Sequence, residues 1–368
     1  MTGAMYAAIA GLRTHMNKMN VIGNNIANVN TNSYKSQRAV FKDAMYTLYQ
    51  RGSDGSSENG GKNPSQIGYG SQVSTIDLDM ATGTYTLGRS TDCMIYGDGF
   101  FMVGKKNLAD NITSMNPDSI KGLTLTRVGD FQFKSDGYLC DGNGNPVYGF
   151  LTTGIDPAGK VTVSDQLVPI RLPKIETAED GKMEVKFPVP NEETGRLQDY
   201  KPEGEEAAEL PNVRLDSISI NPDTGAITGT DKDTHQLITI GYLAIANLTN
   251  PNGVTHTNGF YYKAGDGAGD MDVSLLGGGA EKLGITHVNG STFEQDSADV
   301  GGEAVMSDQL RIGSAGGTNL MTGGLEGSNV DLANEVSEMI TTQRGYQANT
   351  RIITVTDSML EELVNMKR

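Results

Sequence analysis

The sequence predicts an α+β protein that is mainly β, with a long helix at each end of the chain. Three observations lead to this prediction. Apolar residues at both ends recur at alternating steps of three and four, the spacing of a helix that buries one face. The segments between the two ends alternate apolar and polar residues, as antiparallel strands do. Glycine, asparagine and aspartate separate those segments, and 47 of the 368 residues are glycine, so short strands joined by tight turns are expected.

The N-terminal helix is predicted from an apolar series near the start of the chain. Its members are Met5, Ile9, Leu12, Met16 and Met19, and the series resumes at Ile22 and Ile26 after one skipped step. A row of amides lies beside this series, at Asn17, Asn20, Asn24 and Asn28. Asparagine and Gly23 are poor helix formers, so the helix is expected to be stable only when it is packed. We expect these amides to hydrogen-bond between helices in an assembly.

The C-terminal helix is predicted over residues 332–367, with Ser328 or Asn329 as its cap. Its apolar seam is Leu332, Val336, Met339, Tyr346, Ile353, Leu360 and Val364, with Gln343, Thr350 and Asp357 at the intervening positions. A second stripe, Ile352, Met359, Leu363 and Met366, widens the apolar face. No proline interrupts either terminal segment.

The two terminal helices are expected to pack on each other, because a single amphipathic helix would leave its apolar stripe in water. Residues 1–50 carry a net charge of +4 and residues 328–368 a net charge of −2, which favours this pairing. Two helices of an ordinary globular core are the alternative. The residues predicted to pack between subunits are Met5, Ile9, Leu12, Met16, Ile22, Asn24, Asn28, Leu332, Val336, Met339, Tyr346, Ile353, Leu360 and Leu363.

The middle of the chain predicts antiparallel β structure. Its turn signals include Asp136-Gly137, Asp141-Gly142 and Asp223-Thr224-Gly225. Residues 52–70 form a stretch rich in glycine, serine and asparagine, which we interpret as a connection between the first helix and the β region. Residues 176–209 contain eleven acidic and four basic side chains, and we interpret this segment as a surface-exposed insert.

The charge and hydropathy of the chain exclude several classes of partner. The net charge is −16, and phosphate contacts require clustered lysine and arginine, so nucleic acid is not expected as a partner. No apolar run approaches the length of a membrane span, and the N-terminus does not have the pattern of a cleavable signal peptide. Cys93 and Cys140 cannot form a zinc site by themselves, and a disulfide between them stays open.

The sequence contains no recognisable motif for catalysis, cofactor binding or metal binding. Gly97-Asp98-Gly99 lacks the third glycine of a dinucleotide-binding loop, and the chain has no phosphate-binding P-loop. The alternation at residues 141–145 resembles a calcium loop, but Pro146 and Thr152 stand where glycine and glutamate are required, so a turn is predicted. Asp266, Asp270 and Asp272 lie among glycines and indicate a loop. We predict no catalytic residue, no cofactor and no metal site.

Several segments resemble, in order, the blocks of a known family, the bacterial flagellar rod and hook proteins. They are VIGNNIANVNTNSYKS (residues 21–36), NPSQIGYG (63–70), TDCMIYGDGFFMV (91–103), TRVGDFQFKSDGYLCDGNGNPVYGF (126–150), GYLAIANLTNPNGV (241–254) and the last 45 residues from Gly324. Asn32-Ser33 departs from the family, which usually has a glycine before the aromatic-lysine pair. Cys93 and Cys140 replace aliphatic or polar residues.

The resemblance implies a polymer subunit with nested domains. Residues 1–50 and 324–368 are expected to form an axial coiled coil, residues 51–154 and 236–323 a discontinuous inner β domain, and residues 155–235 an acidic outer β domain inserted into it. The family's subunits leave the cell through the flagellar type III export apparatus, without a cleavable signal. The implied partners are further copies of the chain, other axial and junction proteins, and the hook cap.

Three functions remain open on the sequence. The long segment between recognisable blocks favours a subunit of the flagellar hook, a flexible tube that transmits motor torque to the filament. A distal rod or other rod-family protein, structural but stiff, is the alternative. A secreted enzyme or glycan-binding β protein with helical ends is the candidate from a different class.

Overall fold

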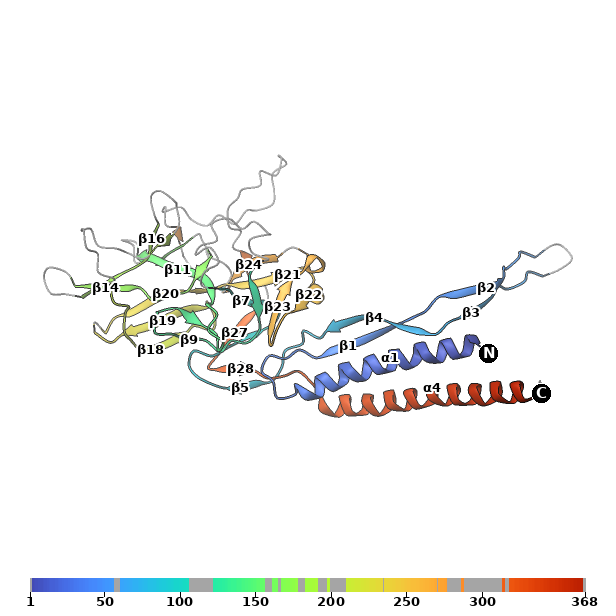
Figure 1. Ribbon diagram of the computed structural model, residues 1–368. Helices are drawn as coiled ribbons and strands as arrows, with labels where there is room; N and C mark the ends of the chain where they lie inside the picture. Colours follow the sequence, from blue (N-terminus) through green and yellow to red (C-terminus); the bar gives the residue numbers. More distant parts are fainter. Residues whose placement is uncertain are drawn as a thin grey trace. The chain divides into compact units, whose positions relative to one another are not determined.

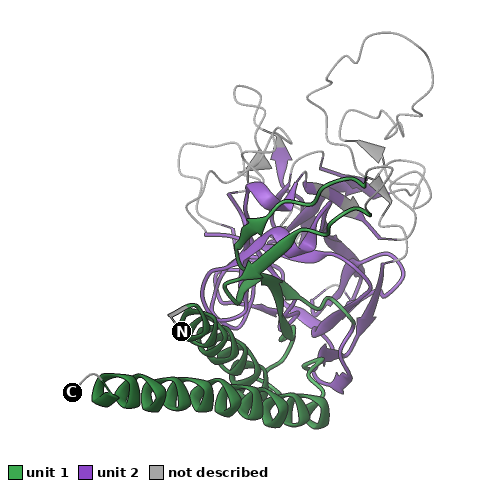
Figure 2. Ribbon diagram, turned by 90° about the vertical axis from the view of Figure 1, so that its right-hand side faces the viewer, with its two compact units in different colours: residues 1–81, 328–368 green, residues 82–327 purple. Residues whose placement is uncertain are grey.

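The chain forms two compact units in the computed structural model. The residues described are 2–55, 60–105, 122–155, 161–164, 167–177, 183–190, 197–198, 210–233, 235–269, 271–276, 286–287, 313–314 and 318–366. Unit 1 comprises residues 1–81 and 328–368, and unit 2 comprises residues 82–327 (Figure 2). The predicted α+β class, mainly β with a helix at each end, is confirmed.

Unit 1 contains the two long helices, α1 (Thr2–Ala27) and α4 (Leu332–Met366). They lie side by side and antiparallel, so the two chain termini are at the same end of the pair (Figure 1). The predicted caps of α4 are wrong. Asp331 caps the helix instead, because its Oδ1 accepts hydrogen bonds from the backbone N–H groups of Ala333 and Asn334. Within the described residues, neither helix carries the apolar stretch that a bilayer crossing needs.

Two strand pairs complete unit 1 and form one extended hairpin. β1 (Gln37–Asp43) pairs with β4 (Ser71–Leu78), and β2 (Tyr46–Gln50) pairs with β3 (Ser65–Gly68). The stretch 52–70, interpreted above as a connection, therefore contains β3, and its described residues next to β2 and β3 continue the hairpin through a bridge between Ser53 and Lys62. The hairpin packs along α1, where the Thr14 hydroxyl donates to the backbone oxygen of Ser71 over 3.0 Å.

Unit 2 is built on two larger sheets. The strands of the first sheet, in pairing order, are β18 (Leu215–Ile220), β19 (Ala226–Asp231), β20 (Leu237–Leu243), β11 (Tyr148–Ile155), β12 (Val161–Val163) and β25 (Thr286–His287), with β13 (Val168–Pro169) also paired to β11. Those of the second sheet are β22 (Val254–His256), β23 (Tyr261–Ala264), β8 (Thr124–Thr126), β7 (Phe100–Val103), β21 (Ile245–Leu248), β24 (Met271–Leu275) and β26 (Gly313–Ser314). Most pairs are antiparallel; β12–β25 and β24–β26 are parallel.

Smaller strand pairs and two short 3-10 helices complete unit 2. The pairs are β5 (Tyr85–Leu87) with β28 (Gly324–Glu326), β6 (Cys93–Tyr96) with β27 (Asn319–Thr322), β9 (Gln132–Phe133) with β10 (Leu139–Cys140), β14 (Lys174–Thr177) with β15 (Met183–Lys186), and β16 (Val189–Pro190) with β17 (Leu197–Gln198). The 3-10 helices are η1 (Pro251–Gly253) and η2 (Asp266–Ala268).

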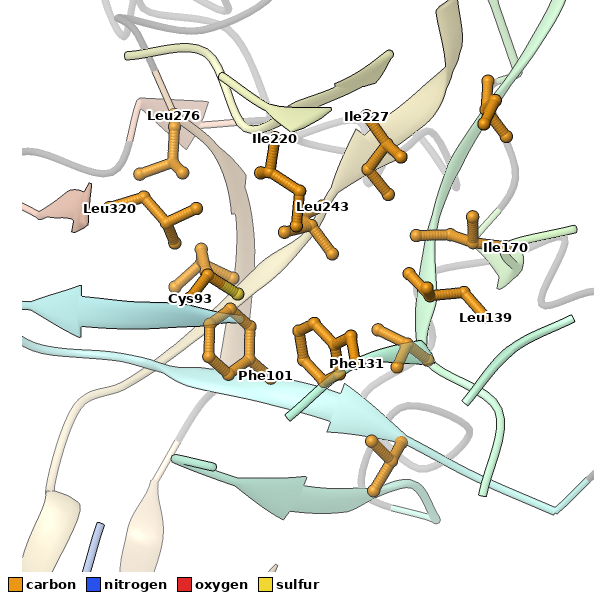
Figure 3. Close-up of a cluster of buried hydrophobic side chains, with 14 of the residues drawn as sticks. Cys93, Phe101, Phe131, Leu139, Ile170, Ile220, Ile227, Leu243, Leu276 and Leu320 are labelled. Atoms are coloured by element: carbon orange, nitrogen blue, oxygen red, sulfur yellow. The ribbon is translucent and has the colours of Figure 1, made fainter. Parts of the chain in front are cut away.

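The core of unit 2 draws on both larger sheets (Figure 3). Phe101 of β7 packs edge-on against Phe131, with ring centroids 5.0 Å apart, and Ile227 and Leu243 enter from the first sheet. β20 continues into β21 after a single residue, so the chain passes from one sheet to the other inside the core. Cys93 belongs to this core. Cys93 and Cys140 are both buried and do not form a disulfide, which answers the question that the sequence left open.

The predicted turns of unit 2 are confirmed, whereas its predicted subdivision is not. Gly137 and Gly225 take φ values of 83° and 68°, which favour glycine, at the predicted Asp-Gly and Asp-Thr-Gly turns. β18 and β19 come from the predicted outer insert, yet they share a sheet with β20 and β11. A separate outer domain over residues 155–235 therefore stays a prediction.

Candidate assembly surface

The pairing of α1 with α4 is fixed by an antiparallel register of contacts. Gly11 lies against Asn349, and His15 lies against Gly345. Further along, Lys18 Nζ forms an ion pair of 2.8 Å with Glu338 Oε2, and Asn25 donates to Glu335. Continuing this register places Thr2 opposite Ser358. Residues 359–366 of α4 therefore extend beyond the start of α1, as Figure 1 shows.

The face of α4 that packs inward alternates steps of four and three. Its buried and half-buried positions are Glu335, Met339, Thr342, Tyr346, Asn349, Ile353, Thr356 and Leu360, and Gly345 and Thr350 beside them are half-buried as well. The predicted seam residues Met339, Tyr346, Ile353 and Leu360 lie on this face. Of the predicted intervening positions, Thr350 is half-buried, but Gln343 and Asp357 are exposed while Thr342 and Thr356 are buried in their place. Their hydroxyls donate back to the helix carbonyls of Glu338 and Ile352, which lets polar residues occupy the seam.

Two glycines let the helices approach closely. A Cβ atom on Gly345 would lie 2.8 Å from Cε1 of the His15 ring, and one on Gly11 would lie 2.6 Å from Asn349 Nδ2. The His15 ring cannot easily yield, because it also packs edge-on against Phe41 of β1, with centroids 6.1 Å apart. Burial and the nearby charge of Lys18 both lower the pKa of His15, so the imidazole favours the neutral form here. At these positions the two helices are therefore in close contact through glycines and polar side chains rather than through large apolar side chains.

Asn25 is the polar centre of unit 1 and is completely buried. Its Nδ2 donates to the backbone oxygen of Gln37 and to Glu335 Oε1, both over 2.8 Å. Its Oδ1 accepts from the backbone N–H of Gln37 and from the Tyr34 hydroxyl, both over 3.0 Å. An amide has two donor hydrogens and two lone pairs, so Asn25 is fully used. It joins α1 to β1, to the turn after α1 and to α4.

The pKa of Tyr34 and that of Glu335 reflect this burial. Burial, followed by the negative charge of Glu335, raises the pKa of the Tyr34 phenol from 10.0 to about 12. Burial also raises the pKa of Glu335, against the effect of the hydrogen bond from Asn25, which lowers it. Both groups favour their protonated forms more strongly in the folded chain than in the unfolded chain.

Unit 1 is therefore expected to lose stability at alkaline pH through Tyr34. The folded pKa is the higher one, so this contribution is complete below the unfolded value of 10.0 and is lost as the pH rises towards about 12. The urea midpoint of the helical circular dichroism band should fall over this interval in the natural chain. It should fall less in Tyr34→Phe, which has no phenol to ionise. Parallel losses in the two proteins would contradict the assignment.

The turn after α1 and the start of α4 are fastened to the segment where the chain leaves unit 1. The Lys35 ammonium donates to the backbone oxygen of Ala81 over 2.9 Å, and Asn329 Nδ2 donates to that of Asp79 over 2.8 Å. Asn329 Oδ1 accepts from the backbone N–H of Ser36 over 2.7 Å. Ser33 takes a φ of 57°, a left-handed conformation that explains why a glycine is usual at this place in the resembled family.

The predicted packing residues fall into three groups. Ile22 is buried within unit 1. Those that are half-buried are Met5, Leu12, Asn28, Met339, Tyr346, Ile353 and Leu360. Those that are exposed are Ile9, Met16, Asn24, Leu332, Val336 and Leu363. Asn24 and Asn28 form hydrogen bonds within the chain, since Asn24 Nδ2 donates to Tyr34 and Asn28 Nδ2 to the Asn24 backbone oxygen. Bonds from these amides to another copy stay a prediction.

Unit 1 exposes far more apolar side chains than it buries. Among its described residues, the buried apolar ones are Ala8, Val21, Ile22 and Tyr34. Its large exposed ones are Tyr6, Ile9 and Met16 on α1; Phe41, Met45, Tyr46, Leu48, Tyr49, Ile67, Tyr69 and Ile76 on the hairpin; and Leu332, Val336, Ile340, Ile352, Val355, Met359, Leu363, Val364 and Met366 on α4. We call these three sets the unit 1 apolar surface. A surface of this kind marks an interaction site.

Chemical sites are not found among the described residues. No three histidine, cysteine, aspartate or glutamate side chains gather there as metal ligands. The loop at Asp141 is a turn, as predicted, because the carboxylate already accepts hydrogen bonds from the backbone N–H groups of Asn143 and Asn145 and from the Tyr261 hydroxyl. Asp270 lies outside the described residues. The fold and the surface of unit 1 thus define an assembly protein.

Two family models match the two ends of the chain. The one described as Flagella basal body rod protein matches residues 5–35, and the one described as Flagellar basal body rod FlgEFG protein C-terminal matches residues 321–366. The flagellar basal-body rod protein FlgG of Bacillus subtilis is 28% identical over 369 residues, covering 100% of both chains. The flagellar hook proteins FlgE of Borreliella burgdorferi and Salmonella typhimurium are each 24% identical, covering 100% and 98% of this chain and 100% and 99% of their own.

The chain belongs to the family of bacterial flagellar rod and hook proteins. The resemblance drawn from the sequence is confirmed. Proteins of this family are structural, and this chain is a structural protein rather than an enzyme. Relatives of both kinds, hook and rod, match over the whole chain, so the identities do not separate the two.

Proposed function

We propose that the chain is the subunit of a flagellar hook, which polymerises into a flexible tube outside the cell and transmits motor torque to the filament. The observation that carries assembly in this proposal is the unit 1 apolar surface, and the long segment between the recognisable family blocks, residues 155–235, favours a hook over a rod. Burying a large apolar side chain contributes about 1.5–3 kcal/mol. Unit 1 leaves many such side chains in water, and further copies of the same chain are the partners that the hook relatives suggest.

The assembly proposed is a helical polymer. Contacts between different patches on successive copies extend into an open helix when the rotation from one copy to the next does not close a ring. The terminal helices then form the axial part as a coiled coil, and residues 155–235 form an acidic outer domain. Other axial and junction proteins, the hook cap and the type III export apparatus are the proposed partners. Export proceeds without removal of a signal peptide, so the assembled subunit should keep its N-terminal sequence.

The α4 overhang tests the proposal directly. Met359 and Leu363 are each about half exposed, and they lie on the part of α4 that extends beyond α1. The double variant Met359→Gln/Leu363→Gln keeps helix-forming residues, so the monomer should retain its helical signal. Losing about 2–3 kcal/mol of burial between copies should raise the critical concentration for polymerisation about 30–150-fold. Sedimentation and electron microscopy of purified protein measure this.

Glu361→Gln/Glu362→Gln is the matched control. These two exposed side chains lie on the same turns of α4 but offer no apolar area. The control should form tubes at nearly the natural concentration. If the apolar double variant polymerises as readily as this control, the α4 overhang is not an assembly contact.

A rod subunit is the second candidate, and the hairpin of unit 1 favours it. Tyr46, Leu48 and Tyr49 on β2, Ile67 on β3 and Met45 just before β2 are all exposed. If neighbouring copies cover these side chains, the contacts are dry and apolar and resist sliding, which suits a stiff, straight rod. Cells that lack the gene distinguish the candidates. Complete rods without hooks support the hook subunit, and incomplete rods support the rod subunit.

A further inference from the structure

We propose that Asn258 is a site of spontaneous deamidation and isomerisation, at the tip of the hairpin that joins β22 to β23. The inference concerns unit 2 and does not depend on whether the chain forms hooks or rods. It rests on a comparison of the Asn-Gly pairs in the chain. The printed sequence has five, at residues 59, 143, 252, 258 and 289, and Asn59 and Asn289 lie outside the described residues.

The reaction needs only the chain and water. The backbone nitrogen of Gly259 attacks Cγ of Asn258, forming a C–N bond and a five-membered succinimide. The bond from Cγ to Nδ2 breaks, and ammonia leaves with the proton that the attacking nitrogen gives up. Water then adds to one of the two succinimide carbonyls and opens the ring to aspartate or isoaspartate. A glycine in second place favours the attack, because it has no side chain to obstruct its nitrogen.

The hairpin tip leaves both reacting groups available. Asn258 and Gly259 are exposed, and a Cβ built on Gly259 meets no atom within 4 Å. The turn is closed by the backbone N–H of Tyr261, which donates to the backbone oxygen of Asn258 over 3.3 Å. Among the described residues, neither the Asn258 side chain nor the Gly259 N–H forms a hydrogen bond. Gly259 takes a φ of 62°, a conformation open mainly to glycine.

The Asn143-Gly144 pair is held at both reacting groups. Asn143 Nδ2 donates to the Tyr261 hydroxyl over 2.8 Å, and the Gly144 N–H donates to the backbone oxygen of Asp141 over 3.0 Å. Attack would have to break both hydrogen bonds. Asn143 should therefore react more slowly than Asn258.

The Asn252-Gly253 pair is held by the 3-10 helix η1. The Gly253 N–H donates to the backbone oxygen of Asn250 over 3.1 Å. The glycine is also packed tightly, since a Cβ built on it would lie 2.1 Å from the carbonyl of Gly267. The nitrogen of Gly253 is therefore neither free nor able to move towards the Asn252 side chain.

Modification at Asn258 would act on a structured part of unit 2. Either product adds a negative charge to a chain whose net charge is already −16. Isoaspartate also lengthens the main chain of the turn by one carbon. Tyr261, three residues on, pairs with Thr126 of β8, and its hydroxyl holds the Asp141 turn. The product should therefore loosen β23 at the end nearest the turn.

The test follows the three described Asn-Gly pairs in one molecule. Purified full-length protein is kept at mildly alkaline pH, and peptide mapping with isoaspartyl methyltransferase labelling measures modification at each site. Asn258 should react first, and Asn143 and Asn252 about tenfold more slowly, since each is restrained by hydrogen bonds. In denaturant the three rates should converge, because the local sequence is then the only difference left.

Asn258→Gln is the matched variant. Its longer side chain would require a six-membered ring, so the labelling at this position should disappear while the fold is kept. Equal rates at the three sites in the folded protein would overturn the proposal. So would the absence of isoaspartate at Asn258 in the natural chain.

Discussion

Arg127→Met is expected to destabilise unit 2 by about 3–5 kcal/mol, because it leaves the carboxylate of Glu326 buried without its cation. Both side chains are completely buried, and Arg127 Nη1 lies 3.9 Å from Glu326 Oε2. Each of the two side chains also forms a hydrogen bond with a backbone group. Arg127 Nη2 donates to the backbone oxygen of Gly97 over 2.8 Å, and Glu326 Oε1 accepts from the backbone N–H of Gly83 over 3.0 Å.

Urea unfolding followed by near-ultraviolet circular dichroism measures this effect, and amide exchange of β6 and β28 localises it. Lys186→Met is the matched control in unit 2, since Lys186 pairs with Glu184 and both side chains are partly exposed to water, so its loss should cost at most about 1 kcal/mol. The double variant Arg127→Met/Glu326→Gln removes both charges and should be less destabilised than the two single changes together. Equal effects of Arg127→Met and Lys186→Met on the stability of unit 2 would contradict the argument.

Glu326 lies close in sequence to one of the two places where the chain crosses between the units, at residues 81–82 and 327–328. Gly83 and Glu326 stand at the unit 2 end of these two crossings, and their hydrogen bond ties one to the other. At the unit 1 end, Asn329 Nδ2 donates to the backbone oxygen of Asp79 and links the two segments there as well.

The sequence predicted the features that depend on local pattern. A heptad spacing at each end was enough to place both helices, and α4 begins at the predicted Leu332. Turns at Gly137 and Gly225 followed from residue type, because only a few residues adopt positive φ without strain. The hairpin strands β2 and β3 were missed for two reasons. The glycine and serine residues around them resemble a linker, and in the single chain their apolar side chains are exposed to solvent rather than buried in a core.

The hydrophobic pattern of the sequence could not distinguish apolar residues that pack within the chain from apolar residues that are exposed. Leu332 and Met339 belong to the same apolar series, yet Leu332 is 47% exposed and Met339 packs inward. Both positions carry the same signal in the sequence. Thr342 and Thr356 gave no signal, since their burial depends on hydroxyl bonds within α4. Asn25 was missed for a similar reason, because it is one of several asparagines and only its neighbours in space distinguish it.

Asn25→Leu is expected to cost unit 1 about 3 kcal/mol or more, and to prevent polymerisation. The substitution keeps the branched shape with a somewhat larger volume, but it removes the acceptor of the Tyr34 hydroxyl and the partners of the Gln37 backbone and of Glu335. Each buried polar group left without a partner costs about 1–3 kcal/mol. The helical circular dichroism band reports this loss in urea, because α1 and α4 are the only α-helices among the described residues. Asn20→Ala, an exposed amide on the same helix, should change stability by less than about 0.5 kcal/mol.

Reversing the direction of the hydrogen bond between Asn25 and Glu335 tests whether this bond itself stabilises the packing of α1 on α4. Asn25→Asp keeps the acceptor for Tyr34 and Gln37 but places a carboxylate against Glu335, and so should be severely destabilising at neutral pH. Adding Glu335→Gln supplies an amide that can donate to the introduced carboxylate in the opposite direction, and it removes the like charge. Stability and tube formation should then recover in part, limited by the donor to the Gln37 oxygen that aspartate lacks. If Glu335→Gln gives Asn25→Asp no recovery, the bond between the two helices does not govern unit 1, and packing alone holds α4 in place.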